Sequence, residues 1–397
     1  MTEKKVGNDS KIIGYWMSEK KSQKLKWTEF AGVCRKHGFS LVKMNLDKPL
    51  ENQGPFTVIL HKLTEIIVQT MQGNTKAKSM IEEVEAYIEN HPEVAVIDPL
   101  DNVRKLLDRY ITYKIIHNSN LEDVDVFIPT FVELTSDDVR TNRLKLRNAG
   151  VGYPFVCKPS VGHGSKECHK MMIIFNESGL ADCKPPCVAQ TFVNHNAVLF
   201  KIYVVGDKYR VVERPSLKNF YASNQASIHF DSHDVSKPDS TSSLTILDPE
   251  DMEQSMTSVS TDPTKLAAIV EIVTERLGMS LLGIDVVVEN STGRHAIIDV
   301  NSYPSYDGYP NFFDSLMDCI LERTADHKRT KQQSIQKNLS EKRESVGGKV
   351  DQEDSGFDTS DSSDEKKRKQ RLRCTIGGGS QTSANQVMSK KHLERQH

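Results

Sequence analysis

The stretch Leu282-Gly-Ile-Asp285-Val-Val-Val-Glu289 and, after a short link, the stretch His295-Ala-Ile-Ile-Asp299-Val-Asn301 decide how this chain is interpreted. Both are rich in β-branched residues, and the link Asn-Ser-Thr-Gly-Arg contains turn-forming residues, so the two predict a β-hairpin. Each strand carries a carboxylate. Because side chains alternate along a strand, Asp299 and Asn301 lie on the same face.

The hairpin therefore predicts a site for a divalent cation. Asp285, Asp299 and Asn301 supply carboxylate and amide oxygens, which suit Mg²⁺ with phosphate oxygens as its other ligands. The alternative is that both acids are exposed at strand ends. A strand that looks buried rarely carries an unpaired Asp, which favours the cation site.

Composition limits the classes of partner. The 397 residues allow two or three domains, and 37% of them are hydrophobic, with the deficit concentrated near the C-terminus. The formal net charge of −2 gives no bulk field for nucleic acid or membranes. An anion site must therefore be a local cluster of cations.

The cysteines and the apolar runs indicate the compartment. Seven scattered cysteines, an odd number, fit free thiols in a reducing environment. Cys183 and Cys187, with His163 and His169 nearby, also allow a zinc site, although the spacing is unusual. The first residues lack a signal core and no run approaches a membrane span, so we expect a cytoplasmic protein, with the nucleus as a second location.

Strand and helix patterns alternate in the first hundred residues. Strands are predicted at residues 12–17, 40–46, 56–60 and 94–97, with one helix capped by Thr28 and another over residues 77–90. This order predicts an open, largely parallel sheet covered by helices.

Strands dominate the next part of the chain. Asp101 is predicted to cap a helix that continues through Ile111. Strands follow at residues 126–128, 154–158, 171–175, 187–190, 197–205 and 209–213, then a long loop over 236–263 and helices over 265–277 and 311–323. From Asp326 the alternating acidic and basic runs predict a disordered tail, whose basic run is a nuclear address, an anion-binding arm or merely solvated.

A lysine and a glycine loop precede the hairpin. The strand Tyr153-Pro-Phe-Val-Cys-Lys158 ends in a lysine and is followed by Ser160-Val-Gly-His-Gly-Ser-Lys166. Such a loop lets backbone N–H groups approach phosphate oxygens while the lysine supplies positive charge. The chain has neither a Walker loop nor the protein-kinase motifs.

This order of lysine strand, glycine loop and paired acids resembles the ATP-grasp fold. Residues 12–325 are similar to the family of inositol-tetrakisphosphate 1-kinases, also called inositol 1,3,4-trisphosphate 5/6-kinases. The resemblance rests on eight ordered motifs: Gly14-Tyr-Trp-Met-Ser-Glu-Lys-Lys21, His61-Lys-Leu-Thr64, Leu107-Asp-Arg109, Pro185-Pro-Cys-Val188, Gln190-Thr-Phe-Val-Asn-His-Asn-Ala-Val198, Arg214-Pro-Ser-Leu-Lys-Asn219, Ser232-His-Asp-Val-Ser-Lys-Pro238 and Leu282-Gly-Ile-Asp285.

The resemblance implies an α/β protein with α+β subdomains and an ATP- and Mg²⁺-dependent kinase. Residues 1–100 would form an N-terminal α/β domain on the substrate side and residues 101–215 the central subdomain with the nucleotide lysine. Residues 216–325 would carry the metal acids, and residues 326–397 the tail. The substrates would be inositol 3,4,5,6-tetrakisphosphate, phosphorylated at position 1, and inositol 1,3,4-trisphosphate, phosphorylated at position 5 or 6, with reversible, isomerase-like exchange. The partners would be these small molecules and adenine nucleotides, bound by a monomer without nucleic acid or membrane insertion.

The resemblance also implies the site residues. The ATP-binding set is Arg109, Lys158, Gln190, Thr191, Phe192, Val193, Asn194, His195, Asn196, Ala197, Val198, Leu199, Phe200, Lys201, Ser216, Ser232 and Ser236. The substrate-binding set is Lys21, His169, Lys201, Arg214 and Asn301, with Lys62 as a weaker candidate. Two Mg²⁺ ions would be held by Asp285, Asp299 and Asn301, and a loose transition state needs no dedicated base.

Two departures and two other functions stay open. Ser305 stands where the family usually has glycine, and the loop around residues 165–168 is longer than expected. A carboxylate–amine ligase would keep the same fold but form an acylphosphate. A catalytically inactive inositol-phosphate sensor would not need the intact Lys158 and metal acids.

Overall fold

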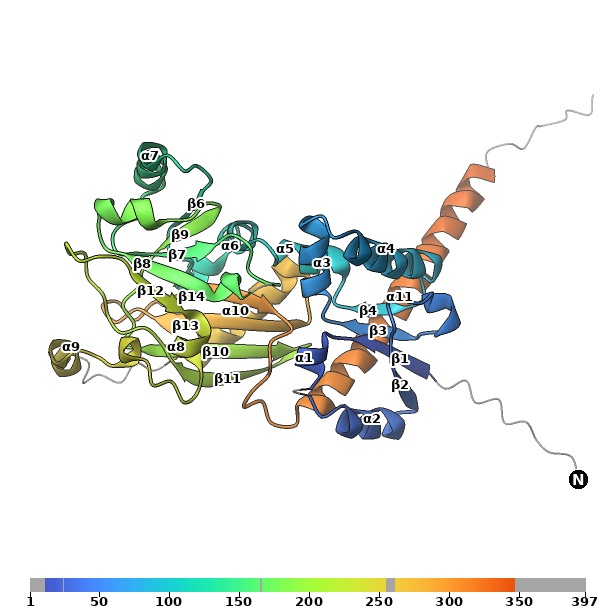
Figure 1. The fold of residues 1–397 in the computed structure, drawn as a ribbon. Coiled ribbons are helices and arrows are strands. Elements are labelled where there is room, and N and C mark those ends of the chain that lie inside the picture. Colours follow the sequence, from blue (N-terminus) through green and yellow to red (C-terminus); the bar gives the residue numbers. More distant parts are fainter. Residues whose placement is uncertain (1–10, 24, 165, 255–260, 347–397) are drawn as a thin grey trace, which may run out of the picture. The chain divides into compact units, whose positions relative to one another are not determined.

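The computed structural model describes residues 11–23, 25–164, 166–254 and 261–346 (Figure 1). The chain divides into two units, residues 1–340 and 341–397. The first contains all three sheets, and the second is described only where it continues the last helix.

The N-terminal sheet consists of β1 (Lys11–Trp16), β2 (Phe39–Lys43), β3 (Val58–His61) and β4 (Ala95–Ile97) in the order β2-β1-β3-β4. Every neighbouring pair is parallel, which confirms the predicted parallel sheet. Parallel strands place all their carboxyl ends at one edge. The residues that follow β1, β3 and β4 therefore gather along a single edge of this sheet.

Helices cover both faces of the N-terminal sheet. Successive side chains of β3 point to opposite faces of the sheet, and they are buried on both. Ile59 packs into a core with α3 (Thr64–Met71) and α4 (Thr75–Asn90). Val58 and Leu60 pack into a second core with α2 (Trp27–Lys36) and the start of α11 (Phe312–Val346). The short α1 (Glu19–Ser22) follows β1.

A second sheet, here called the hairpin sheet, contains the two acid-bearing strands. Its order is β11-β10-β13-β14-β5, with bounds Lys208–Pro215, Val198–Val205, Leu281–Val288, His295–Ser302 and Val126–Phe127. The helix α10 (Pro263–Leu277) packs on its apolar face beside α6 (Arg109–His117). Asp262 caps α10 by accepting from the N–H of Thr264, and Gly278 ends it in the left-handed conformation.

A third sheet, here called the lysine sheet, contains the strand of Lys158. Its order is β12-β8-β7-β9-β6, with bounds Ile228–Asp231, Lys170–Ile174, Phe155–Pro159, Cys187–Thr191 and Phe131–Leu134. All its pairs are antiparallel. The helix α7 (Val139–Ala149) packs beside β6 (Figure 1).

The prediction of a single helix over residues 101–111 is wrong, because two separate helices occupy this part of the chain. After α5 (Leu100–Lys105) the chain pairs with the segment that follows β7. There the N–H of Gly162 donates to Leu107 O and the N–H of Arg109 donates to Ser160 O, each at 2.9 Å. A new helix, α6, then begins with Asp108 as its cap, accepting from the N–H of Ile111.

Other boundaries also differ from the prediction. No side-chain cap precedes α2, so the prediction that Thr28 caps it is wrong. The prediction omitted the strands β6 and β12 and the helices α1, α3, α7, α8 (Ser232–Ser236) and α9 (Pro249–Gln254). The predicted loop over 236–263 contains α9 and follows α8, and its residues 255–260 lie outside the described residues.

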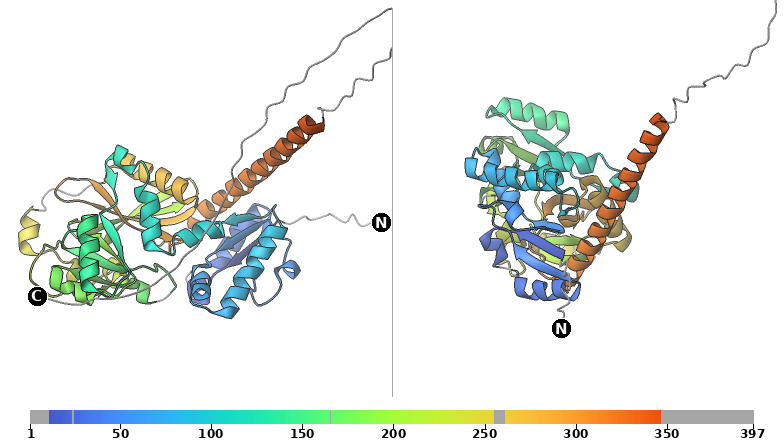
Figure 2. Two further views of the ribbon diagram at one scale, coloured as in Figure 1. Left: turned by 90° about the horizontal axis from the view of Figure 1, so that it is seen from above. Right: turned by 90° about the vertical axis from the view of Figure 1, so that its right-hand side faces the viewer.

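The last helix continues beyond its predicted end at residue 323. Figure 2 shows α11 as one uninterrupted helix, and it ends at Val346. Residues 326–346, predicted as part of the tail, are therefore helical, and the acidic and basic runs of the tail lie outside the described residues.

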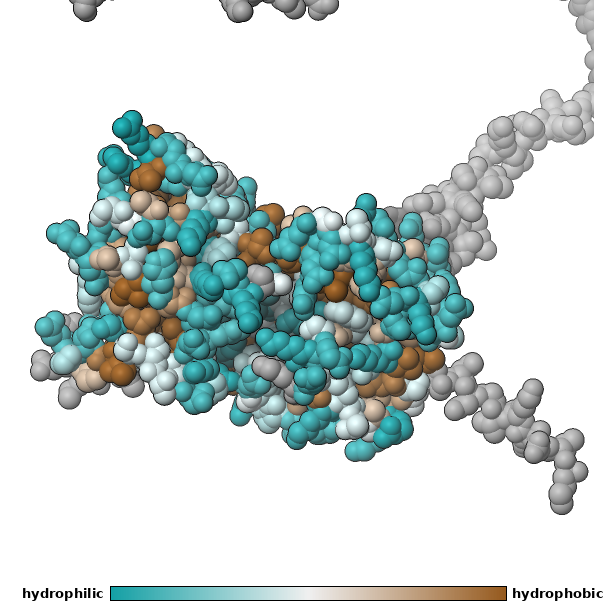
Figure 3. Space-filling view, in the orientation of Figure 1, coloured by the Kyte–Doolittle hydropathy of each residue, from teal (hydrophilic) through white to brown (hydrophobic). Residues whose placement is uncertain are grey.

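None of the helices in the described part of the chain has both the length and the apolar composition needed to cross a membrane. The face seen in Figure 3 is mostly hydrophilic, and hydrophobic residues reach it in separate groups.

Two charged residues join the N-terminal sheet to the open end of the β13–β14 hairpin. The carboxylate of Asp98, which follows β4 and is 4% exposed, accepts from the N–H groups of Ser280 at 2.7 Å and Leu281 at 2.9 Å. Lys62, which follows β3, donates to the carbonyl oxygen of Tyr303 at 2.7 Å. The carboxyl edge of the N-terminal sheet therefore holds both strands that carry the acids.

Replacing Asp98 with alanine should destabilise the protein by about 3 kcal/mol, because two buried N–H groups lose their acceptors. Urea unfolding followed by circular dichroism measures the change. Asp101→Ala, which removes an exposed partner of Arg104, should leave the midpoint nearly unchanged. A wild-type midpoint for Asp98→Ala would show that this link contributes nothing to stability.

Candidate functional site

The predicted metal residues lie together on the hairpin. Asp285 is directly opposite Asp299, and Gly283 is opposite Asn301. Residues opposite each other in an antiparallel pair project to the same face, and so do residues two apart on one strand. The three oxygen-bearing side chains thus share one face, as the sequence predicted.

The ammonium group of Lys158 lies beside this hairpin and is enclosed by acceptors. Its side chain, 5% exposed, donates to Ile298 O of β14 at 2.7 Å and to Gln190 Oε1 of β9 at 2.8 Å. It also donates to the hydroxyl of Tyr113 on α6 at 3.1 Å. Lys158 therefore connects the lysine sheet to the hairpin sheet.

Tyr113 was not singled out by the sequence, because its apolar neighbours on α6 mark it only as a core residue. Its hydroxyl lies 3.0 Å from Ile298 O and 3.2 Å from Asp299 Oδ1, both acceptors for its single proton. It thus links Lys158 to Asp299.

Arg109 completes the cluster from the first residue of α6. Its guanidinium, 4% exposed, donates to the carbonyl oxygens of Pro159 at 2.6 Å and Cys168 at 3.2 Å. Its Nε lies 3.8 Å from Asp299 Oδ1 and makes no hydrogen bond to a described residue. The arginine therefore fixes the loop after β7 while its charge faces Asp299.

The two acids have opposite pKa shifts. Burial raises the pKa of Asp285, and the nearby Lys201 only partly offsets this. Burial would also raise the pKa of Asp299, but the charges of Arg109 and Lys158 outweigh it and lower that pKa. Asp299 is therefore held ionised by its neighbours.

The lysines show the complementary effect. Burial lowers the pKa of Lys158 to about 8, although Asp299 acts in the opposite direction. Burial would lower the pKa of Lys201 too, but its ion pair with Asp285 raises it. Three cations, Arg109, Lys158 and Lys201, thus surround two carboxylates, so the cluster has an excess of positive charge suited to an anionic ligand.

His163 is a second residue that the sequence assigned to no phosphate role. It lies in the glycine loop, close enough to Lys62, Arg109 and Asp299 for their charges to affect it. Burial and the cations Lys62 and Arg109 lower the pKa of His163 to about 3. The feature of the sequence that could have identified His163 is its position in the glycine loop that follows Lys158.

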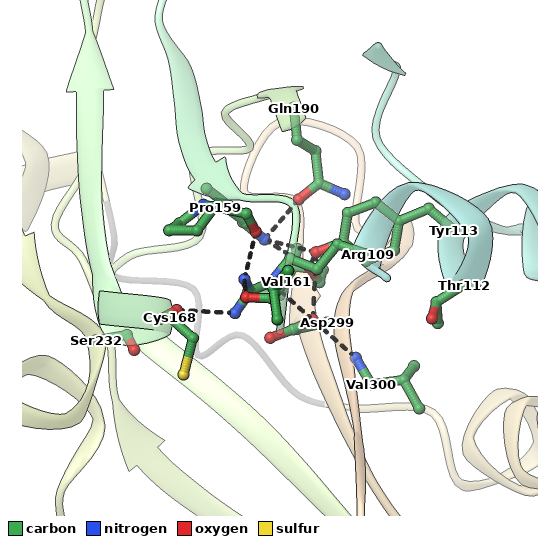
Figure 4. A network of polar contacts seen from close by, with 12 residues as sticks. Arg109, Thr112, Tyr113, Pro159, Val161, Cys168, Gln190, Ser232, Asp299 and Val300 are labelled. Carbon is green, nitrogen blue, oxygen red and sulfur yellow. Dashed lines mark hydrogen bonds and ion pairs between the residues drawn. The ribbon is translucent and has the colours of Figure 1, made fainter. Parts of the chain in front are cut away.

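His169 lies in the short 3₁₀ turn Glu167–His169 before β8, and its ring packs against that of His233 with centroids 3.7 Å apart and a tilt of 31°. Burial and the neighbouring His233 lower the pKa of His169 to about 4. Its Nδ1 is 3.4 Å from Ser232 Oγ. Ser232 and the Cys168 carbonyl that Arg109 binds thus lie on the same side of the cluster (Figure 4), and His169 lies next to Ser232.

The segment predicted to lie along the adenine runs from β9 through a connection into β10. His195 in this connection is 3% exposed, and its Nδ1 is 2.6 Å from Val193 O. Since a carbonyl oxygen only accepts, Nδ1 carries the proton, and Nε2 accepts from Ser216 Oγ at 2.7 Å. Ser216, a predicted ATP contact, uses its proton to fix this connection.

Three further predicted residues lie on other elements of the fold. Lys21 is in α1, at the carboxyl edge of the N-terminal sheet. Arg214 donates to Asp307 O at 2.7 Å, and Ser236 donates to Ser232 O at 2.8 Å. Ser305 is not among the residues with positive φ, so the backbone there does not require glycine.

The donor set fits magnesium and does not fit zinc. Asp285, Asp299 and Asn301 offer hard oxygen donors on one face. The positive charge of the surrounding cations favours phosphate oxygens as the further ligands of the metal. Within the described residues, no group of three or more His, Cys, Asp or Glu side chains is arranged to hold a metal. Cys183 and Cys187 instead pack with Cys157 in an apolar core, so the zinc alternative is not supported.

Comparison with known proteins agrees with this geometry. The family profile described as the inositol 1,3,4-trisphosphate 5/6-kinase ATP-grasp domain matches residues 120–322. The profile described as the pre-ATP-grasp domain of the same kinases matches residues 12–103.

Similar proteins cover most of the chain. A protein of Xenopus laevis named inositol-tetrakisphosphate 1-kinase is 45% identical over 316 residues, which is 78% of each chain. One of the same name from Danio rerio is 44% identical over 316 residues, also 78% of each chain. The crystal structure of D-cycloserine synthetase, 15% identical, superposes with a TM-score of 0.51 over 79% of this chain and 99% of that chain, a likeness of fold alone.

The buried His195 should make the protein less stable in mild acid. Burial lowers its pKa from 6.5 to about 4, so the unfolded chain binds more protons between these values and stability falls as the pH decreases through this window. Between about pH 7 and pH 5, His195→Gln should therefore lose roughly 2 kcal/mol less stability than wild type. Urea unfolding at both pH values measures this.

His91→Gln is the control with the opposite sign, because hydrogen bonds to Glu51 raise the pKa of His91. This variant should lose more stability than wild type on the same acidification. Identical pH profiles for wild type and His195→Gln would contradict the assignment of a neutral, buried His195.

Proposed function

Because the chain belongs to the inositol 1,3,4-trisphosphate 5/6-kinase family, we propose that it phosphorylates inositol 3,4,5,6-tetrakisphosphate at position 1 and inositol 1,3,4-trisphosphate at position 5 or 6. The phosphoryl donor is ATP. The observation that carries the proposal is the joining of Lys158, from the lysine sheet, to the strand of Asp299 in the hairpin sheet. A nucleotide bound between these sheets has a cation and the metal acids at the same end.

The proposed nucleotide site uses the cluster and the segment from Gln190 to Lys201. Lys158 and Arg109 provide positive charge for the phosphates. Gln190 supports a ligand next to Lys158, because its Nε2 is buried and has no partner among the described residues. An acceptor on the nucleotide would satisfy this donor.

The proposed metal ligands are Asp285, Asp299 and Asn301, holding two Mg²⁺ ions. When bound, Mg²⁺ neutralises the phosphate oxygens as the γ-phosphoryl group moves to a ring hydroxyl. Lys201 pairs with Asp285 in the structure, so this lysine must give up the carboxylate when the metal binds. Its ammonium then becomes available to a substrate phosphate, which is the role we propose for it.

A ring with several phosphates needs cations placed separately around it. We assign this task to Lys21, His169, Lys201 and Arg214, with Asn301 as a further contact. Lys62, the weaker candidate from the sequence, is retained, and His163 is added because it lies close to Lys62, Arg109 and Asp299. Burial lowers the pKa of Lys62 to about 8, so a bound phosphate would stabilise its charged form.

No general base is proposed for the acceptor hydroxyl, since a loose transition state depends on positioning and charge. The family resemblance implies in addition that transfer is reversible, and we include this in the proposal. A bound nucleoside diphosphate would take a phosphoryl group back from a more highly phosphorylated inositol. Repeated transfer in both directions would interconvert inositol phosphate isomers.

The proposed setting is a reducing compartment, the cytoplasm with the nucleus as a second location. None of the six cysteines in the described part of the chain forms a disulfide, although Cys157, Cys183 and Cys187 share one core. Such proximity without a bond fits reducing conditions. We propose that the protein acts there as a monomer.

The proposal is tested by incubating the purified full-length protein with Mg²⁺-ATP and a panel of inositol phosphates, resolving the products by isomer. Transfer to inositol 3,4,5,6-tetrakisphosphate and inositol 1,3,4-trisphosphate is expected. ATP turnover that requires a carboxylate together with an amine, and no inositol phosphate, would instead show a ligase. Binding of inositol phosphates without any turnover would show a sensor.

Asp299→Asn should lower the rate of transfer at least about a hundredfold, because the variant loses a charged metal ligand while keeping its shape. Initial rates at saturating Mg²⁺-ATP measure this. Asp207→Ala, in the exposed turn between β10 and β11, is the control and should behave as wild type. Normal turnover by a folded Asp299→Asn variant would show that the metal assignment is wrong.

A further inference from the structure

The connection between β9 and β10, residues 192–197, here called the hinge, has an unusual backbone. Asn196 and Ala197 both adopt positive φ, at 54° and 60°. Non-glycine residues rarely occupy this region, and two in succession persist only where their surroundings hold them. The residues that hold the hinge therefore determine its shape.

A reciprocal pair of amides holds Asn196. The N–H of Asn196 donates to Asn219 Oδ1 at 2.9 Å, and Asn219 Nδ2 donates to Asn196 Oδ1 at 2.8 Å. Asn219 is 3% exposed. Because both ends of its amide are used by the hinge and it is buried, Asn219 acts on the hinge and has no surface for a ligand.

The residues on either side of Asn219 contact the hinge as well. The N–H of Ser216 donates to Ala197 O at 2.8 Å, and the N–H of Phe220 donates to Asn194 Oδ1 at 2.8 Å. The ring of Phe220 packs edge-on against Phe192, with centroids 5.5 Å apart. The segment from Ser216 to Phe220 thus forms a support behind the whole hinge.

The same junction reaches the turn of the metal-bearing hairpin. Asn290, at the start of that turn, donates from its N–H to Asn194 O at 2.9 Å and from Nδ2 to Asn196 Oδ1 at 3.1 Å. Asn196 Oδ1 therefore accepts from both Asn219 and Asn290. The hinge is fixed to the strands that carry Asp285 and Asp299.

We propose that Asn219 is a positioning residue for nucleotide binding, holding the hinge in the left-handed turn that presents its backbone to the base. This inference rests on the proposed function, in which the hinge contacts ATP. This role needs the side-chain amide of Asn219. Only a side chain with both an acceptor and a donor can bind the N–H and the Oδ1 of Asn196 at the same time.

Asn219→Asp tests the inference, because it keeps the acceptor but replaces the donor with an oxygen facing Asn196 Oδ1. We expect the KM for ATP to rise about tenfold while kcat at saturating ATP stays within about twofold of wild type. The preference for ATP over GTP, measured as the ratio of kcat/KM values, should also fall. Asn224→Asp, an exposed asparagine on the same loop, is the matched control and should leave all three values unchanged.

A second variant, Asn219→Ala, removes both hydrogen bonds without burying a charge, and the same increase in KM is expected. An unchanged KM for ATP in a folded variant would overturn the inference, and so would a loss of kcat at unchanged KM. Failure of both variants to fold would also overturn it, since Asn219 would then serve the fold and not the hinge. A wild-type protein without ATP-dependent transfer would instead reject the proposed function.

Discussion

The buried ammonium group of Lys158 is the interaction on which the site depends. It is the point where the lysine sheet, the hairpin sheet and α6 meet, since its three acceptors come from Gln190, Ile298 and Tyr113. A buried charge is tolerated only where acceptors and opposite charges compensate it. The cluster therefore requires the two sheets to lie close together, and it also leaves a cation at the proposed phosphate site.

The same principle explains the pairing around the acids. Lys201 neutralises Asp285 across neighbouring strands, while Arg109 and Lys158 keep Asp299 ionised. Two carboxylates surrounded by three cations hold little attraction for a bare divalent ion. In the proposed function, a metal that arrives with a nucleoside triphosphate would bring the negative charge that frees Lys201, so metal and nucleotide binding would be coupled by charge.

The N-terminal sheet contributes to this site through its edge. Its parallel strands end where Lys62 and Asp98 reach the open end of the hairpin, and His61 Nε2 donates to the carbonyl oxygen of Asp98 at 2.8 Å. One buried edge thus fixes the acid-bearing strands and carries Lys21 and Lys62, two of the residues proposed to bind inositol phosphates. The opposite end of the hairpin is fixed by Asn290 at the hinge, so the hairpin is held at both ends.

The sequence by itself determined the hairpin, the parallel N-terminal sheet and the strands on which Lys158, Asp285, Asp299 and Asn301 lie, because strand periodicity and turn residues act locally. The break between α5 and α6, the roles of Tyr113 and His163 and the hinge support by Asn219 were decided only by the tertiary structure. Each depends on residues distant in sequence: the loop after β7 interrupts the helix, and Asn219 is used because the chain returns to Asn196. Local sequence patterns do not reveal such contacts. A tyrosine in a helix or an asparagine in a loop has the same local pattern whether or not a residue distant in sequence contacts it.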